Sequence, residues 1–510
     1  DEWKSSNNFK LTYGVRAELP MYHNELQDNP AIGNLTFKDG YKIEIDKWPN
    51  SKLQVNPRVG FNWDVKGDRS IQVRGGTGLF SGVLPFVWFT NQPTASGTVQ
   101  SPEIGLAGNA IPDDFRFNPD FKNQVAKYPG LFPQEISGTL ASGVSIAEVK
   151  KDFKMPRIWR SNIAGDIELP FNMILTLEAL FSKDVNAVVQ QNMNHPAADG
   201  VFSGTDGRPR WSNNRVISSV ASAMVLDNSS EGYQTLLTAQ LTKNYSNGFA
   251  GMIAYTYNIS KDVTSNPGSN AYSAWTSNLD AFDLNNPQLS HSNFAVPHRV
   301  VGSLSYRVEY LKHLATTFSV YYNGAAQGRY SVAYSNDMNG NGASSDLIYV
   351  PRSANELFFV DVPGKMTAAE QGAKFQEYVD GDSYLKERKG KYAERFGKVQ
   401  PWKNRFDVKI LQDIFTHFGT DKRYTLQLSL DIVNAGNLLS KDWGLYTRSG
   451  LSNNYGVIMP LKYMGLNAGG GPKYTLNAKD IADFDNKNRE INQLSTGSTW
   501  GMLFGVRLIF

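Results

Sequence analysis

A strict alternation of side chains near the end of the sequence places the strongest constraint on the fold. Between residues 500 and 510 an apolar side chain occupies every second position, and the positions between them include two glycines and an arginine. The apolar row consists of Trp500, Met502, Phe504, Val506, Leu508 and Phe510. Because a β-strand turns successive side chains to opposite faces, this stretch predicts a strand with one continuous apolar face. Such a strand, ending on an aromatic residue, is typical of one that closes a membrane-embedded barrel.

The same alternation recurs along the whole chain and predicts about twelve strands. The segments are 9–19, 58–65, 71–74, 162–169, 171–181, 233–243, 249–260, 299–309, 314–322, 406–411, 424–433 and 500–510. Most of them approach the length that crosses a bilayer at a tilt, which is about 9–11 residues. Between the third and fourth segments, residues 145–151 are expected to form a short helix.

The connections between these segments follow a regular schedule. A turn of a few residues alternates with a connection of roughly 35–75 residues along the whole chain. Outer-membrane barrels place short turns on the periplasmic side and long loops outside. A soluble β-sandwich also alternates apolar and polar residues, but several connections of this length would be unusual in it. This alternation of short and long connections therefore favours an all-β fold, a transmembrane antiparallel β-barrel with short periplasmic turns and long extracellular loops.

The composition argues against several other classes of protein. A net charge of +3 over 510 residues disfavours a nucleic-acid-binding protein, which would carry a basic surface. No apolar run approaches the roughly 18 residues of a membrane helix, and a mean hydropathy of -0.39 suits strands whose residues alternate. The chain has no cysteine, which excludes disulfide bonds and thiolate metal sites.

Five segments give the sequence a resemblance to a known family. They are 57–63, 72–78, 296–300, 431–439 and 505–510. Together and in this order they resemble TonB-dependent outer-membrane transporters. The closest resemblance is to the Oar-like branch of Bacteroidota, which is related to the SusC type. The likeness extends over essentially the whole chain, as barrel only.

The resemblance implies that residues 1–510 are the carboxyl-terminal part of a 22-stranded outer-membrane barrel. The plug domain and about ten strands of that family are not in this sequence, which also lacks an initiator Met and a signal peptide. We therefore expect either part of a longer chain or a processed piece of one. The implied function is TonB-dependent active import of a peptide, glycan or chelate across the outer membrane. A surface docking or secretion-related barrel and an outer-membrane enzyme are the alternatives.

The resemblance also implies a set of partners in the cell envelope. These are outer-membrane lipid or lipopolysaccharide, the plug domain and remaining strands, the TonB–ExbB–ExbD complex and a surface lipoprotein. No nucleic acid is expected. The sequence contains neither a His-Glu-x-x-His pair nor a Gly-x-Ser-x-Gly elbow, so we predict that the protein is not an enzyme and has no catalytic residues.

One stretch has the spacing of a calcium-binding loop. Asp337, Asn339, Asn341 and Asp346 place oxygen atoms at alternate positions around glycines, as loops that wrap Ca²⁺ do. Ile348 stands where an EF-hand has its last glutamate. An Asn/Gly-rich turn explains the same pattern without a metal, and no other cofactor is expected.

Two further groups of residues are candidates for function. Charged residues predicted on the face away from lipid are Arg16, Arg58, Arg74, Asp166, Glu168, Glu178, Arg299, Arg307, Glu309, Arg405, Asp407, Lys409 and Asp431. Aromatic candidates for ligand contact in or beside the long loops are Trp88, Phe89, Trp211, Trp275, Tyr334 and Trp443. Exposed aromatic rings stack on sugars or grip peptides, but the same rings also pack loops against each other.

Overall fold

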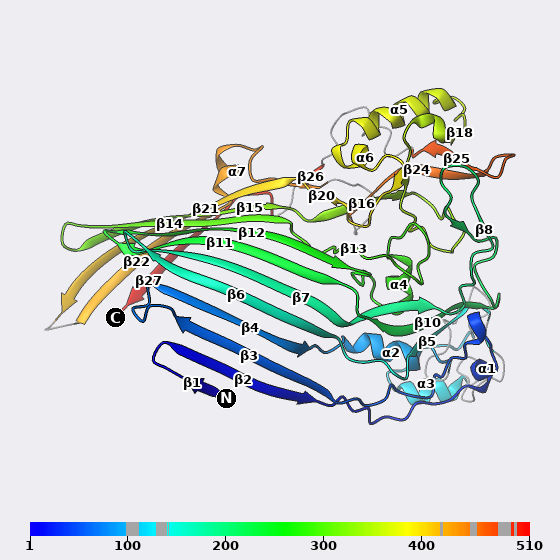
Figure 1. The fold of residues 1–510 in the computed structure, drawn as a ribbon, viewed down its shortest axis with the longest axis horizontal. Coiled ribbons are helices and arrows are strands. Elements are labelled where there is room, and N and C mark those ends of the chain that lie inside the picture. The colour runs from blue at the N-terminus through cyan, green and yellow to red at the C-terminus, as the bar shows by residue number, and fades with distance from the viewer. Residues whose placement is uncertain are drawn as a thin grey trace.

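The computed structural model describes every residue except 98–111, 129–139, 141, 419–421, 449–455, 478–490 and 494–496. Its main feature is a curved antiparallel sheet whose long strands lie side by side in chain order (Figure 1). The twelve long strands are β2 (Phe9–Glu18), β3 (Gln54–Asp64), β4 (Ile71–Ser81), β6 (Arg157–Leu169), β7 (Met173–Asn192), β11 (Tyr233–Ser246), β12 (Phe249–Asp262), β14 (His298–Tyr310), β15 (Leu314–Ala326), β21 (Trp402–Phe418), β22 (Lys422–Val433) and β27 (Gly501–Ile509). The predicted twelve strands are confirmed, and the short β1 (Glu2–Lys4) pairs beside β2.

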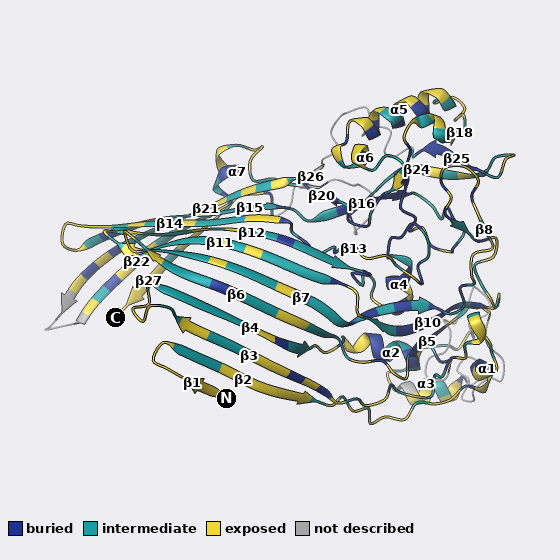
Figure 2. Cartoon of the chain, viewed as in Figure 1, coloured by how far each residue is buried: buried dark blue, intermediate teal, exposed yellow. Residues whose placement is uncertain are grey.

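The register between neighbouring strands collects side chains of one kind on one face. In the β22–β27 pair, Leu430 lies opposite Phe504. On the other face of the same pair, Gln427 lies opposite Arg507. We call the face with the aliphatic and aromatic rows the apolar face, and the opposite one the polar face. Figure 2 shows how exposed positions recur along the strands, and Phe504 is 78% exposed. None of the described helices is both long and apolar enough to cross a membrane.

Short and long connections lie at opposite ends of the sheet (Figure 1). The turn between β6 and β7 shows how the short ones form, because Phe171 and Asn172 both have positive φ, at 65° and 57°. Two such residues are typical of a tight hairpin turn. Phe171 therefore lies in the turn, and the expected strand 171–181 begins only at Met173.

The long connections contain secondary structure of their own. Their helices are α1 (Pro30–Gly33), η1 (Lys38–Gly40), α2 (Phe86–Thr94), α3 (Phe121–Lys127), α4 (Ala271–Thr276), η3 (Ala354–Glu356), α5 (Ala368–Asp380), α6 (Ser383–Glu387) and α7 (Ala435–Leu439). Their strands are β5 (Val144–Val149), β8 (Gly200–Val201), β9 (Pro209–Arg210), β10 (Val220–Ser229), β13 (Ser290–His291), β16 (Arg329–Tyr334), β17 (Tyr349–Val350), β18 (Phe358–Phe359), β19 (Lys391–Tyr392), β20 (Lys398–Val399), β23 (Tyr446–Arg448), β24 (Val457–Leu466), β25 (Pro472–Leu476) and β26 (Ile491–Gln493).

The helix expected at 145–151 is wrong. Residues 144–149 form β5, which pairs in parallel with β10 as part of an extension of the main sheet. Ile146 and Val149 are buried, at 0% and 2% exposed. A short apolar run does not distinguish a buried strand from a helix by its period, and the β-branched residues here favour the strand.

Three apolar cores hold the long connections together. Loop core 1 surrounds Tyr334, Phe375 and Tyr474, where α5 packs on the sheet β18-β25-β24-β16-β20. Loop core 2 surrounds Trp88 and Trp275. Loop core 3 surrounds isoleucines of the first long connection and of β5. The end of the sheet opposite the tight turns therefore carries a packed cap of loops.

The two faces predict opposite responses to the same substitution in one strand. Leu241 and Gln240 are neighbours in β11, but Leu241 lies in the apolar row and Gln240 on the polar face. Leu241→Arg is expected to lower the stability of the folded protein in a bilayer by about 2–4 kcal/mol, because it places a charge in lipid. Gln240→Arg is expected to change it little. Urea titrations of the whole protein in lipid vesicles measure both values, and equal losses would contradict the assignment of the faces.

Candidate functional site

The polar face carries ion pairs that cross from strand to strand. Arg74 on β4 pairs with Asp166 on β6. Arg307 on β14 lies 2.7 Å from Asp413 on β21, which also accepts a hydrogen bond from Gln427 at 2.9 Å. Lys409 and Asp431 pair at 2.8 Å across β21 and β22, whereas Arg405 pairs with Asp407 at 2.9 Å within β21. The predicted grouping of charged residues on this face is confirmed, and because opposite charges alternate, they do not form a site of one sign.

A buried arginine joins two of the long connections, the one between β7 and β11 and the one between β15 and β21. Arg208 is fully buried, and its Nε donates to Asp206 at 2.9 Å while its Nη2 donates to the carbonyl of Leu347 at 2.8 Å. The rings of Tyr334 and Tyr392 lie 5.0 and 5.1 Å from the guanidinium carbon, a cation–π arrangement. Sequence patterns gave no sign of this cluster, because Arg208 lies more than 100 residues from Tyr334, Leu347 and Tyr392.

The four predicted Ca²⁺ ligands lie beside loop core 1, and all their side-chain oxygens except Asp346 Oδ1 accept hydrogen bonds from backbone N–H groups. Asp337 accepts hydrogen bonds from the N–H groups three and five residues ahead, both at 2.8 Å. Asn339 and Asn341 each accept from the N–H two residues ahead, at 3.0 and 2.8 Å. Asp346 lies 3.6 Å from Arg208, and burial raises the pKa of Asp346 to about 7 against the effect of that guanidinium. These contacts stabilise the turn, and Ca²⁺ binding stays a prediction.

The six aromatic candidates separate into buried and exposed side chains. Trp88, Phe89, Trp211, Trp275 and Tyr334 are buried, whereas Trp443 is 59% exposed. The first two pack with Trp275 in loop core 2, and Trp211 donates its indole N–H to the carbonyl of Pro196 at 2.9 Å. The five buried rings therefore pack loops against each other. Trp443 is the candidate with a face open to a ligand, and ligand contact stays a prediction for the set.

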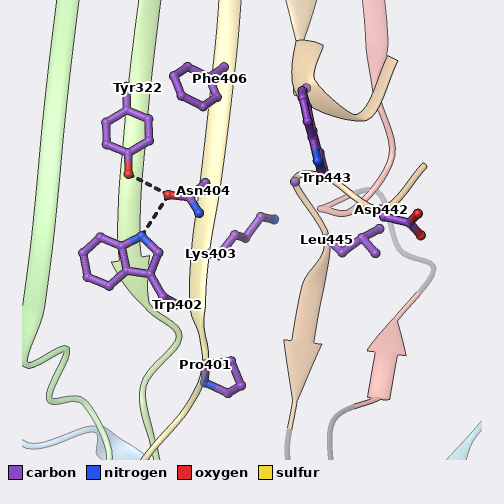
Figure 3. A pocket seen from close by; sticks show the side chains of 11 residues that line it. Tyr322, Pro401, Trp402, Lys403, Asn404, Phe406, Asp442, Trp443 and Leu445 are labelled. Carbon is purple, nitrogen blue, oxygen red and sulfur yellow. Dashed lines mark hydrogen bonds between the residues drawn. The ribbon is translucent and has the colours of Figure 1, made fainter. Parts of the chain in front are cut away.

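Trp443 lines a cavity of about 680 Å³ between the first residues of β21, near Trp402, and the segment that follows α7. Tyr322 on β15 and Trp402, Asn404 and Phe406 on β21 line it as well (Figure 3). The cavity forms because β22 pairs with β21 only from Val408 onwards, so no strand among the described residues pairs with residues 402–407 of β21 on that side. The predicted strand 406–411 did not include Trp402 and Asn404, although these residues alternate in step with Phe406 and lie on the same face.

Asn404 is held in one orientation at this cavity. Its Oδ1 accepts a hydrogen bond from Tyr322 Oη at 2.7 Å and another from Trp402 Nε1 at 2.9 Å (Figure 3). An indole N–H can only donate, so the amide oxygen must face Trp402. The two N–H groups of the amide then point away from these partners. Among the described residues, none accepts a hydrogen bond from Nδ2, so the amide offers two fixed donors to the cavity.

Removal of Arg208 is expected to destabilise the loops it joins. Arg208→Met leaves Asp206 and Asp346 buried without their cation, which costs about 3–5 kcal/mol when a buried pair is broken. Hydrogen exchange in residues 330–350 of the whole protein should rise accordingly. Arg210→Met, two residues away and partly exposed, is the matched control. Equal exchange in the wild type and the Arg208 variant would contradict a structural role for the cluster.

The stability of β5 is expected to depend on pH through Glu148. Burial raises the pKa of this carboxyl to about 7, although Tyr41 Oη donates to it at 3.1 Å and Lys150 also favours its charge. Ionisation of Glu148 therefore costs free energy in the folded state. The free energy of unfolding falls as the pH rises from 4.5, the ordinary pKa of a glutamate, to about 7, the pKa of Glu148 in the folded protein. The loss is at most about 3 kcal/mol.

Hydrogen exchange of residues 144–149 at pH 5 and pH 8, corrected for intrinsic rates, measures this effect. Glu148→Gln should abolish the difference between the two pH values, whereas Glu25→Gln, an exposed control, should leave it unchanged. A difference that persists in Glu148→Gln would assign the pH dependence to another group.

Comparison with solved structures gives several bacterial transporters. The outer membrane transporter YddB from Escherichia coli is 10% identical with a TM-score of 0.38, over 83% of this chain and 39% of that one. The FrpB iron transporter from Neisseria meningitidis is 11% identical with a TM-score of 0.34, over 86% and 40%. A variant of the ferric enterobactin receptor PfeA from Pseudomonas aeruginosa is 7% identical with a TM-score of 0.37, over 98% and 51%. The chain thus spans two fifths to half of these proteins, and the comparison with curated proteins gives no match.

The family model described as "Outer membrane beta barrel domain" matches residues 1–458. This range includes every long strand except β27. The apolar face, with its aromatic and aliphatic rows, is then the surface in contact with lipid, and the polar face with its ion pairs lines the interior. The chain therefore belongs to the outer membrane beta-barrel domain family and resides in the outer membrane.

Proposed function

We propose that this chain is part of a TonB-dependent transporter of the Oar-like, SusC-related type, which imports a peptide, glycan or chelate without changing it covalently. The observation that carries the proposal is the polar face. Charges from different strands pair there across the sheet, as in Arg307 with Asp413 and Lys409 with Asp431. A wide interior lined by satisfied polar groups suits a folded plug domain, which hydrogen-bonds to such a wall.

The packed cap of loops supports the same proposal. Six long connections gather at one end of the strands and bury aromatic side chains in three cores (Figure 1). A cap of this kind gives the extracellular mouth a defined shape, which selective uptake of a scarce ligand requires. In the proposed mechanism the ligand binds between cap and plug. TonB, energised by ExbB and ExbD, then displaces the plug and lets the ligand pass.

Uptake measurements with the full-length protein test this function. Cells that express it are supplied with labelled peptide, glycan and metal-chelate mixtures, with and without a protonophore that removes the energy source of TonB. We expect one class to accumulate, and the accumulation to disappear with the protonophore or with loss of TonB. Accumulation that persists in de-energised cells would instead indicate a passive pore. Export of a protein with no uptake would favour a secretion-related barrel.

A further inference from the structure

The cavity beside Trp443 opens on the outer wall of the barrel. Tyr322 lies opposite Phe406 in the β15–β21 pair, and Asn404 and Trp402 share the parity of Phe406. Val408 and Ile410 continue the same row toward the turn end of the strand. These side chains lie on the lipid-contacting face, whereas Arg405, Asp407 and Lys409 of β21 lie on the interior face. Lys403 also lines the cavity. The rings and the amide that line the cavity are therefore accessible from the membrane side.

The cavity also lies at the level where lipid head groups are found. It is at the end of β21 from which the long extracellular connections leave, as Figure 1 shows for α7. Aromatic side chains gather there, with Trp402 41% and Phe406 43% exposed. Trp and Tyr concentrate at such interfaces because one end of the ring is apolar and the other polar. The outer leaflet at this level consists largely of glycolipid, whose saccharide head group stands above its acyl chains.

We propose that this cavity binds the saccharide head group of an outer-leaflet glycolipid, with the acyl chains along the apolar row below it. A sugar ring presents C–H groups on its faces and hydroxyl groups around its edge. Trp443 offers an exposed aromatic face to the C–H groups. The amide of Asn404 donates to hydroxyl oxygens, and the exposed carboxylate of Asp442 accepts from hydroxyl groups.

The orientation of Asn404 favours a polar head group over an acyl chain inside the cavity. Tyr322 and Trp402 both donate to the amide oxygen, so the amide donors are fixed before any ligand binds. Two donors turned toward a cavity that held only hydrocarbon would lose their hydrogen bonds to water without replacement. Occupation by a hydroxyl-rich group satisfies them, and fixed donors lose little conformational entropy on binding.

The inference rests on the location in the outer membrane and not on the proposed import. A transporter that fails every uptake assay therefore still binds glycolipid if the inference is right. Conversely, uptake that is unaffected by a change at Asn404 is expected, because Asn404 lies on the lipid-contacting face of the wall. The uptake assays therefore test the proposed import, and the glycolipid-binding assays test the cavity, independently of each other.

Two substitutions test the cavity without removing its structural contacts. Asn404→Asp keeps an oxygen for Tyr322 and Trp402 but replaces the two donors with an acceptor. Trp443→Ala removes the exposed ring. Trp500→Ala is the matched control, since Trp500 is 46% exposed and does not line the cavity.

The experiment uses the full-length protein in nanodiscs of phosphatidylethanolamine, titrated with a rough-type lipopolysaccharide that carries lipid A and core sugars. Native mass spectrometry counts the bound glycolipid. We expect the dissociation constant to rise about tenfold in Asn404→Asp and in Trp443→Ala and to stay unchanged in Trp500→Ala. Equal binding by all variants overturns the proposal.

Two competitors separate the parts of the proposal. The deacylated core saccharide should compete weakly, because it lacks the chains that lie along the apolar row. Competition by this saccharide as strong as by intact lipopolysaccharide would assign the cavity to a soluble sugar and overturn the membrane source. Displacement by phosphatidylethanolamine at equal concentration would overturn the role of the sugar.

Discussion

Backbone hydrogen bonding between adjacent strands is the constraint on which the rest of the structure depends. Lipid offers no partner for an N–H or C=O group, so each strand must satisfy its groups on its neighbours. Pairing fixes the register, and the register fixes which side chains share a face, as Leu430 with Phe504 shows. The separation of lipid-contacting rows from paired charges follows from this single requirement. Within the described residues the strand order of the main sheet runs from β1 to β27, and these two edge strands do not pair with each other.

The loops obey a different constraint, because water reaches them and local structure is optional there. They are nevertheless packed, since their aromatic and aliphatic residues bury each other in three cores. Burial also has electrostatic consequences in these loops. It raises the pKa of Glu148 and of Asp346 to about 7, and it makes the contacts of Arg208 expensive to break. The cap thus combines hydrophobic packing with a few charges whose state depends on their partners.

Sequence reasoning recovered the parts of the fold that depend on neighbours along the chain. The two-residue period predicted twelve strands and their faces, because a strand needs no distant information to alternate. It failed where contacts span long separations, as between Arg208 and Leu347, which are 139 residues apart. It also failed at 145–151, where a helix was expected and burial between loops favours the strand β5. At Phe171 a strand was expected, but the positive φ of this residue places it in a turn. The cavity beside Trp443 arises because β22 ends below the end of β21, a difference in length that no motif encodes.

The shared cation at Arg208 has a consequence for how such loops diversify. Because one guanidinium contacts the carboxylate of Asp206, the carbonyl of Leu347 and the ring of Tyr392, the connection between β7 and β11 depends on the one between β15 and β21. Exchanging either of them for the corresponding loop of a relative would leave the buried charge without part of its partners. Recombination should therefore preserve the two connections as a unit, and a chimera that transplants both together is the one that keeps its shape.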